Sequence, residues 1–173
     1  MLPVTNVTRF LDSRGIKYTA YELPPEKLGA LETARLLNVE PGVVFKTIVV
    51  TREKTSSSKG KKPLLVVVPG DSEVDLKALA AALGEKKVYL PTEREAEQLT
   101  GLQAGGISPL ALLNKGFQVV IEASAQAYKE IHISGGQRGL NIRLPVQALI
   151  QLTHARALEN ITVRPTTNAG DQT

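Results

Sequence analysis

The sequence predicts a single α/β or α+β domain, with one mixed, twisted sheet of about seven strands and about five flanking helices. Segments with strand-like and helix-like apolar patterns alternate along the chain. Some predicted strands are separated by short polar turns and others by a helix, which indicates both hairpins and crossovers. A chain of 173 residues with 42% hydrophobic residues is long enough to bury one core.

The predicted domain covers residues 1–161. Residues 162–173 are polar and contain almost no apolar side chains, so they are predicted to form a disordered tail. No internal repeat is visible in the sequence.

The N-terminal part predicts a helix, a strand and a second helix. Val7, Phe10 and Leu11 recur at helical spacing, and a glycine follows where that helix should end. Residues 16–21 alternate between apolar and polar, which is typical of a half-buried strand. Residues 31–38 again show helical spacing and lead into a Pro-Gly turn.

Residues 43–50 predict an apolar strand with one lysine, Lys46, in its middle. Such a lysine either packs its stem and extends its ammonium to water, or serves a cavity, and the residues alone leave both possibilities open. The following residues, 52–62, are polar and basic and predict a long hairpin tip. This tip suits a nucleic-acid phosphate backbone or simply solvent, and neither alternative is favoured. Residues 64–68 then predict a buried central strand.

Two further helices precede a glycine-rich loop. Asp75 is placed to cap a helix over residues 76–83, and residues 88–90 predict a short strand. Thr92 and Glu95 form a capping box that starts a helix ending near residue 101.

The loop of residues 101–109 contains three glycines and ends in proline. Glycine leaves backbone amides uncovered, so such a loop can hold a carboxyl, ester or phosphate oxygen. It has no ionisable side chain and therefore cannot transfer protons. Ser108 lacks a histidine or carboxylate at a recognisable spacing, so a turn or capping role is favoured over a nucleophilic one.

The C-terminal part predicts strands over residues 117–121 and 131–133, a glycine-rich hairpin over 134–144, and a last helix over 145–152. His132 and His154 receive structural roles. The chain has no cysteine, and its two histidines are far apart, so a metal-independent site without a cofactor is expected. The start of the chain lacks a signal-peptide pattern and no apolar run could span a bilayer, so a cytoplasmic protein without membrane contact is expected. The net charge of +4 permits a nucleic-acid partner without requiring one.

Three motifs occur in a characteristic order: Phe45-Lys46-Thr47, then the loop ending Gly-Gly-Ile-Ser-Pro, then Ser134-Gly-Gly-x-Arg-Gly-Leu. In this the chain resembles the YbaK/EbsC family of aminoacyl-tRNA deacylases, whose domain is also the editing insertion of bacterial prolyl-tRNA synthetases. The resemblance covers about residues 7–152. It implies a mixed sheet that curls toward a barrel, with helices outside.

The resemblance implies a trans-editing enzyme that removes a wrong amino acid, cysteine or alanine, from a tRNA, typically tRNA(Pro). No protein nucleophile is implied, because either the substrate's own thiol or water attacks the ester. Lys46 aligns with the lysine on which the family's activity depends and is the candidate catalytic residue. The candidate substrate-binding residues are Tyr21, Gly101, Gly105, Gly106, Ile107, Ser108, Pro109, Ser134, Gly135, Gly136, Arg138 and Asn141.

The expected partners are a mischarged aminoacyl-tRNA and prolyl-tRNA synthetase, with a monomer or weak dimer as the oligomeric state. Two positions depart from the family pattern. Asn141 stands where many cysteine-editing members carry an acid, and Leu23-Pro24 replaces a His-Asp pair. Two alternatives therefore remain: a non-catalytic module that binds a tRNA 3′ end or nucleotide, and a small-molecule hydrolase on the same scaffold.

Overall fold

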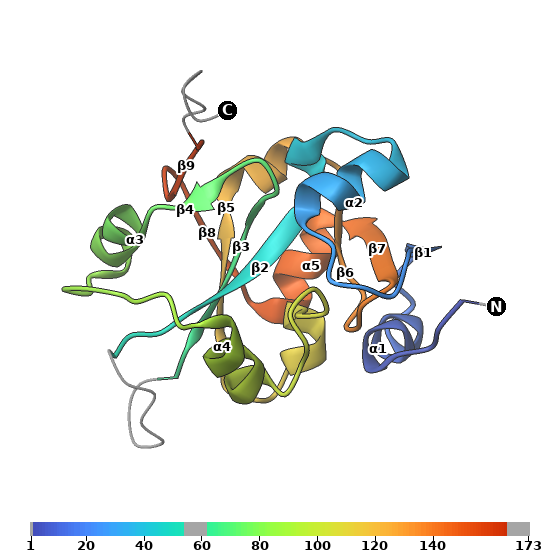
Figure 1. The fold of residues 1–173 in the computed structure, drawn as a ribbon, viewed down its shortest axis with the longest axis horizontal. Helices are drawn as coiled ribbons and strands as arrows, with labels where there is room; N and C mark the ends of the chain where they lie inside the picture. Colours follow the sequence, from blue (N-terminus) through green and yellow to red (C-terminus); the bar gives the residue numbers. More distant parts are fainter. Residues whose placement is uncertain (1, 54–61, 166–173) are drawn as a thin grey trace.

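The computed structural model describes residues 2–53 and 62–165. Its strands form a four-stranded mixed sheet in the order β2-β3-β5-β8, a three-stranded antiparallel sheet in the order β1-β7-β6, and a two-stranded sheet of β4 and β9 (Figure 1). The strands are β1 (Thr19–Glu22), β2 (Phe45–Val50), β3 (Leu64–Pro69), β4 (Glu73–Val74), β5 (Gln118–Glu122), β6 (Glu130–Ser134), β7 (Leu140–Pro145), β8 (Arg156–Leu158) and β9 (Thr162–Val163).

In the described part of the chain, five α-helices of eight residues each surround the sheets. They are α1 (Asn6–Ser13), α2 (Ala30–Leu37), α3 (Leu76–Leu83), α4 (Glu93–Thr100) and α5 (Val146–Thr153), with short 3-10 helices η1 (Pro41–Val43), η2 (Pro109–Leu112) and η3 (Ala123–Ala127). Asp75 and Thr92 cap α3 and α4 as the sequence predicts, because each side chain accepts a hydrogen bond from a backbone N–H in the first turn.

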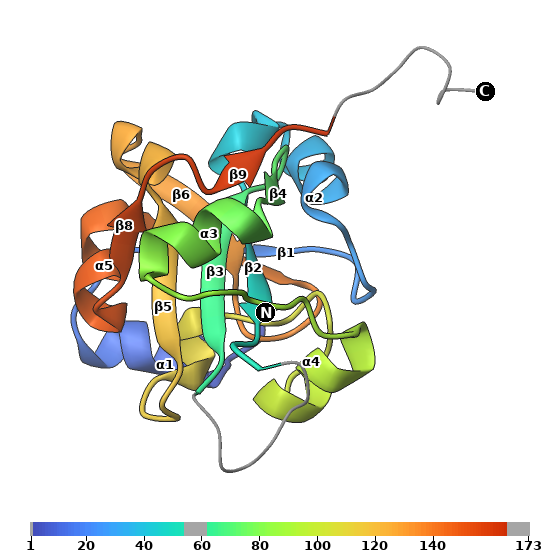
Figure 2. The same cartoon turned by 90° about the vertical axis from the view of Figure 1, so that its left-hand side faces the viewer.

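The four-stranded sheet lies between two apolar cores. On one face, Leu64, Val66 and Val68 of β3 pack with Leu79 of α3. On the other face, alternate residues of β3 and β5 pack against the three-stranded sheet, α1 and α5. Figures 1 and 2 show α3 against one face of this sheet and α1 and α5 on the other side. All six residues of β3 are buried, which confirms its predicted central position.

The mixed sheet with both hairpins and crossovers is confirmed, and the three-stranded sheet is a second, separate layer. A parallel bridge between Val44 and His132 links the two where β2 begins. The sheet therefore curls without closing into a barrel.

Two expectations require correction. Residues 88–90 do not form a strand, because only Tyr89 pairs, exchanging both backbone hydrogen bonds with Thr51, and a proline follows at position 91. The ordered chain also extends past residue 161, since β9 pairs antiparallel with β4 and Ile161 is fully buried. Residues 166–173 of the predicted tail lie outside the described residues, as do residues 54–61 of the basic hairpin tip.

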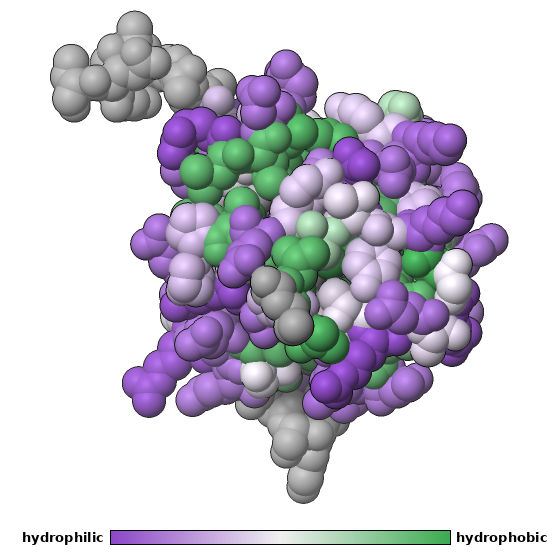
Figure 3. All heavy atoms as spheres, turned by 90° about the vertical axis from the view of Figure 1, so that its right-hand side faces the viewer, coloured by the Kyte–Doolittle hydropathy of each residue, from purple (hydrophilic) through white to green (hydrophobic). Residues whose placement is uncertain are grey.

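The surface that carries α1 and β1 is mixed in character, with apolar areas between hydrophilic ones (Figure 3). Leu2 and Val4 are 44% and 63% exposed there. Within residues 2–53 and 62–165, no helix is long and apolar enough to cross a membrane.

Candidate active site

A cavity of about 350 Å³ opens beside β2, which is an edge strand of the four-stranded sheet. Its other walls are the segment leading into α2, the start of α4, the loop at residues 104–107, and the facing ends of β6 and β7. The cavity therefore lies between the two sheets, and its walls come from the whole length of the chain.

The edge of β2 presents backbone groups to this cavity. Gly70 N–H donates to the Val44 carbonyl. In an antiparallel pair, the backbone groups of successive residues point alternately toward and away from the partner strand, so the even-numbered residues of β2 bond to β3. Thr51 is odd-numbered, and its backbone bonds to Tyr89 on the side of the strand that faces away from β3. Between these points, Thr47 and Val49 direct their N–H and C=O groups away from β3. No strand of the described chain pairs with this part of the edge, and both residues line the cavity.

Lys46 lines the cavity from the middle of β2. Its side chain is 23% exposed, and its Nζ lies 3.3 Å from Oε1 of Glu73 on β4. Glu73 is 61% exposed, so water competes for this ion pair and its contribution to stability is small. The sequence left open whether Lys46 extends to water or serves a cavity, and its position allows the ammonium to do both.

The glycine loop leaves a helix end and turns toward β2. Gly101 ends α4 in the left-handed conformation, and Ser108 caps η2 by accepting a hydrogen bond from Leu110 N–H. Inside the loop, Ala104 N–H donates to Glu97 and Gly106 N–H donates to the carbonyl of residue 103.

The amides of Gly105 and Ile107 have no hydrogen-bond partner within the described residues, and both residues line the cavity. Gly105 has a φ of 90°, a backbone angle that residues with a side chain rarely adopt, so glycine is required to turn the loop here. These two amides are therefore available for an oxygen atom of a ligand.

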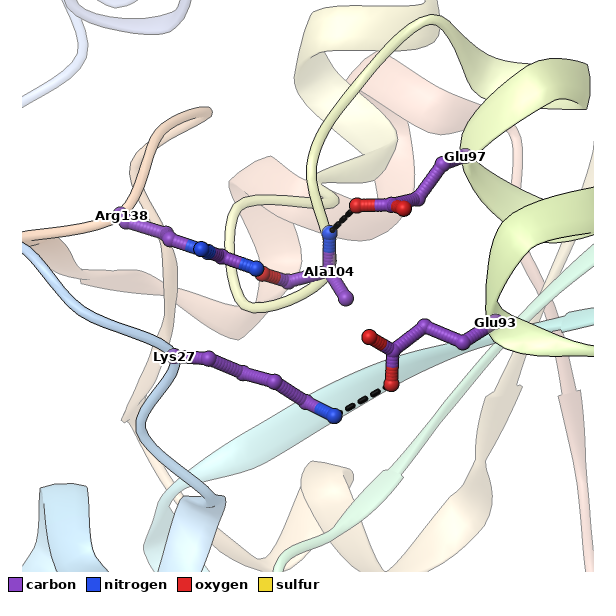
Figure 4. A network of polar contacts seen from close by, with 5 residues as sticks. All are labelled: Lys27, Glu93, Glu97, Ala104 and Arg138. Atoms are coloured by element: carbon purple, nitrogen blue, oxygen red, sulfur yellow. Dashed lines mark hydrogen bonds and ion pairs between the residues drawn. The ribbon is translucent and has the colours of Figure 1, made fainter.

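Two side chains hold the loop from opposite sides. Glu97 Oε2 accepts from Ala104 N–H at 2.9 Å, and Arg138 Nε donates to the Ala104 carbonyl at 2.7 Å. Figure 4 shows Glu97 reaching Ala104 from α4 and Arg138 reaching it from the turn between β6 and β7. Both backbone polar groups of Ala104 are thus held. Because the Ala104 carbonyl and the Gly105 N–H belong to the same peptide unit, the position of the Gly105 amide follows.

An ion pair crosses the rim of the cavity. Lys27, in the segment before α2, pairs with Glu93 in the first turn of α4 (Figure 4). Both side chains are about half exposed, so the pair connects two walls without contributing much free energy.

The hairpin of β6 and β7 supplies the remaining polar wall. Asn141 lines the cavity, is 5% exposed, and its Oδ1 lies 2.8 Å from Nδ1 of His132. Its neighbours Leu140 and Ile142 belong to the core, as the alternation predicts. Burial lowers the pKa of His132 below its usual value, although the hydrogen bond with Asn141 acts in the opposite direction. The lowered pKa favours the neutral ring of His132.

The described residues contain no group of three or more His, Cys, Asp or Glu side chains that could hold a metal ion. The cavity instead offers hydrogen-bond donors, a lysine, apolar walls and the two exposed carboxylates of Glu26 and Glu93. This set suits an uncharged or anionic oxygen-containing ligand with a small apolar part.

A family model described as the aminoacyl-tRNA editing domain matches residues 25–152, which include every residue that lines the cavity except Leu23. The chain belongs to this family. The resemblance stated from the sequence motifs is thereby confirmed.

Relatives of this editing domain include free-standing proteins and parts of synthetases. The chain is 36% identical over 157 residues to an Enterococcus faecalis protein provisionally named Cys-tRNA(Pro)/Cys-tRNA(Cys) deacylase EbsC, covering 90% of this chain and 92% of that protein. It is 30% identical over 115 residues to a proline–tRNA ligase of Thermodesulfovibrio yellowstonii, covering 66% of this chain and 18% of the ligase.

A crystal structure provisionally assigned as a trans-editing enzyme for prolyl tRNA synthetase has the same fold as this editing domain. The TM-score is 0.71 at 25% identity, covering 91% of this chain and 97% of that one. The predicted fold family is confirmed by this match.

The editing domain brings together five of the residues predicted for the site. Those that line the cavity are Lys46, Gly105, Ile107, Ser134 and Asn141. Those that do not are Tyr21, Gly101, Gly106, Ser108, Pro109, Gly135, Gly136 and Arg138.

Most residues outside the cavity support it. Arg138 holds the loop, as described above. A Cβ on Gly106 would lie 2.9 Å from the Cα of Gln137, so this glycine lets the two glycine-rich turns touch. Ser108 is fully buried as a cap. Tyr21 lies opposite Asn141 in the sheet, with its ring 5.5 Å from that of His132.

Sequence reasoning missed several residues around the cavity. His132 received only a structural role, yet it holds Asn141. Glu97 and Lys27 carried no signal, because a charged residue on a helix or in a loop is usually solvated. Position 139 was a glycine of the predicted turn, and the structure adds it to the cavity lining.

Proposed function

We propose that this editing domain is an aminoacyl-tRNA deacylase that removes a mischarged cysteine or alanine from tRNA, with tRNA(Pro) as the carrier. The observation that supports this most directly is the convergence of Lys46, the free amides of Gly105 and Ile107, and Asn141 on one cavity. These groups bind and polarise an ester, and none of them is a nucleophile.

The chemistry is the cleavage of the ester between the amino acid and the terminal ribose. In one route, the substrate's thiol attacks the carbonyl carbon, the ester C–O bond breaks, and a thiolactone leaves while the ribose oxygen takes up the thiol proton. In the other, water attacks and the free amino acid leaves. Both routes place negative charge on the carbonyl oxygen and then on the ribose oxygen.

The cavity groups have roles that fit either route. The amides of Gly105 and Ile107 would hold the carbonyl oxygen as its charge develops, and such a donor is worth about 10²–10³ in rate. Lys46 would position the substrate and offset the charge on the leaving oxygen. The open edge at Thr47 and Val49 offers further backbone hydrogen bonds to the aminoacyl or adenosine part.

One observation favours a second candidate, a binding module that does no chemistry. The ammonium of Lys46 already has a carboxylate partner in Glu73, and position 141 is an amide rather than an acid. Such a module would bind a charged or uncharged tRNA 3′ end without turnover.

A deacylation panel with the purified full chain distinguishes these functions. The substrates are cysteinyl-, alanyl- and prolyl-tRNA(Pro) and cysteinyl-tRNA(Cys), each compared with its spontaneous rate. We expect release of cysteine or alanine from tRNA(Pro), with prolyl-tRNA spared. Binding of all four without release would support the binding module, and neither binding nor release would contradict both proposals.

A further inference from the structure

His132 and Asn141 form a buried pair in the wall of the cavity. His132 is 2% exposed and Asn141 5% exposed, and they lie on the paired strands β6 and β7. The distance between His132 Nδ1 and Asn141 Oδ1 is 2.8 Å, a good hydrogen bond. The pair thus joins Asn141, which lines the cavity, to the neighbouring strand β6.

The chemistry of the two groups fixes the direction of this hydrogen bond. A carbonyl oxygen only accepts, so Nδ1 of His132 must carry the proton. In the neutral ring, which burial favours, Nε2 is then unprotonated. The ring itself packs against Tyr21, whose ring centroid is 5.5 Å away, and the guanidinium of Arg143 lies over the Tyr21 ring at 5.9 Å.

The side-chain nitrogen of Asn141, Nδ2, remains available to donate a hydrogen bond into the cavity. Among the described residues, the only side-chain N or O atoms that are both fully enclosed and unpaired are Nε of Arg52 and Nε of Arg143. Asn141 Nδ2 has no hydrogen-bond partner in the described chain, and therefore it is not enclosed. Since Asn141 lines the cavity, its Nδ2 is accessible from there.

We propose that His132 is a positioning residue that holds the Asn141 amide with its NH₂ group toward the cavity, so that Asn141 acts as a hydrogen-bond donor to the substrate. This inference rests on the proposed deacylase function. The acceptor is an oxygen of the aminoacyl ester or of the terminal ribose. An ammonium group is not a partner for Nδ2, because both groups only donate.

With this orientation of Asn141, the groups that would meet the ester are all hydrogen-bond donors. The free amides of Gly105 and Ile107, the ammonium of Lys46 and the NH₂ of Asn141 all favour an oxygen that becomes negative during the reaction. The carboxylates that line the cavity, Glu26 and Glu93, come from the exposed segment before α2 and from α4. The α-ammonium of an aminoacyl group would therefore face those two residues and not Asn141.

A double-mutant cycle on single-turnover deacylation of alanyl- and cysteinyl-tRNA(Pro) tests the pairing. His132→Phe keeps a ring beside Tyr21 and removes the donor. We expect it to lower the rate constant about tenfold in the wild-type background, which corresponds to about 1.4 kcal/mol. In an Asn141→Ala background the same change should have no further effect. His132→Asn, whose amide can donate from nearly the position of Nδ1, should recover most of the rate.

A purely structural role for His132 predicts a different pattern. His132→Phe would then lower the rate equally in both backgrounds, or leave it unchanged in both, and either outcome overturns the inference. The cycle needs a wild type that releases an amino acid. A wild type without activity contradicts the proposed function and leaves the hydrogen-bond direction to be tested separately.

Ring ¹⁵N chemical shifts provide that separate test. The chain has two histidines, and the exposed His154 can be changed to glutamine so that His132 is the remaining one. We expect the full-length His154→Gln protein to show a protonated Nδ1 and an unprotonated Nε2 near pH 7.5. A proton on Nε2 instead would mean that the amide donates to the ring and presents its oxygen to the cavity, which overturns the inference.

Discussion

Lys46 on β2 and Glu73 on β4 form an ion pair, with 3.3 Å between Nζ and Oε1, that connects the candidate catalytic lysine to the small sheet of β4 and β9. Because Glu73 is the more exposed partner, substrate can displace it from the ammonium at little cost. We expect Lys46→Ala to reduce deacylation at least a hundredfold, because it removes a positioned charge. The deacylation rate measures this loss, and a thermal unfolding curve shows whether the variant is still folded.

Two variants serve as controls for Lys46→Ala. Lys77→Ala removes an exposed lysine on α3 and should leave the rate unchanged. Glu73→Gln should leave the rate within about threefold of wild type or raise it, since the ammonium is then freer to meet the substrate. A Lys46→Ala rate near that of wild type would show that Lys46 is only a strand lysine.

The hydrogen bonds that Glu97 and Arg138 make to Ala104 predict that two substitutions of Glu97 differ in their effect on the deacylation rate. Glu97→Ala removes the acceptor of the Ala104 N–H and should lower the deacylation rate about tenfold by loosening the Gly105 amide. Glu97→Gln keeps an acceptor oxygen and should retain most of the rate. Equal rates for the two variants would show that the loop does not depend on this hydrogen bond.

Position 141 is predicted to influence which amino acid is removed. Asn141→Asp replaces a donor by an acceptor and should raise cysteinyl-tRNA deacylation relative to alanyl-tRNA deacylation about tenfold, or about 1.4 kcal/mol of transition-state preference. The two rate constants are measured side by side with the same tRNA(Pro). An unchanged ratio would exclude position 141 as a determinant of specificity.

The basic hairpin tip predicts a salt-dependent contribution to tRNA binding. We expect the fourfold alanine variant of its lysines to bind tRNA more weakly and with a smaller salt slope, while turnover of bound substrate barely changes. The four lysines are Lys54, Lys59, Lys61 and Lys62.

Arg52 is left out of this set because it bonds to Gln118 and pairs with Glu85 at 3.5 Å. The control variant replaces four exposed lysines elsewhere. Those lysines are Lys17, Lys77, Lys86 and Lys129. If both variants show the same salt slope, the tip has no special role in binding.

His132 should make the stability of the fold depend on pH. Its pKa is lowered in the folded state by burial, and the nearby Arg143 adds to this while Glu130 opposes it. The unfolded chain therefore binds the proton more tightly. Stability is complete above the unfolded pKa of about 6.5 and is lost as the pH falls below it, by at most about 1.4 kcal/mol per pH unit.

Urea unfolding between pH 5 and pH 8 measures this dependence. His132→Asn, which does not titrate, should flatten the curve below about pH 6.5, whereas His154→Gln should leave it unchanged. The same slope in wild type and His132→Asn would assign the pH dependence to carboxylates.

The sequence predicted those parts of the fold in which one local signal dominates. The caps Asp75 and Thr92, the continuous apolar run of β3 and the alternation in β7 each determine an element on their own. Strands β4, β8 and β9 have only two or three residues, too few for a periodic pattern, and they depend on tertiary pairing.

The sequence predicted only those site residues that both belong to a recognised motif and line the cavity. Asn141 lies on a strand whose alternation already indicates its side, whereas Lys46 lies on a strand that is apolar on both faces and is assigned to the site by the family motif alone. Arg138 and Glu97 are 41 positions apart in sequence and both bond to the backbone of Ala104, which no local pattern encodes. The His132–Asn141 bond likewise depends on the strand register of β6 and β7.

The unpaired backbone of β2 at Thr47 and Val49 also has a consequence for self-association. An open strand edge invites a second chain to add its own strand, and proteins usually block such edges with charges or bulges. Here the edge lines a cavity of about 350 Å³, and the ion pair of Lys27 and Glu93 lies beside it. Under the proposed function, the single-stranded end of a tRNA would enter this recess, whereas we expect the surrounding walls to hinder a strand of another folded sheet. We therefore expect one recess both to receive the ligand and to protect the edge from aggregation.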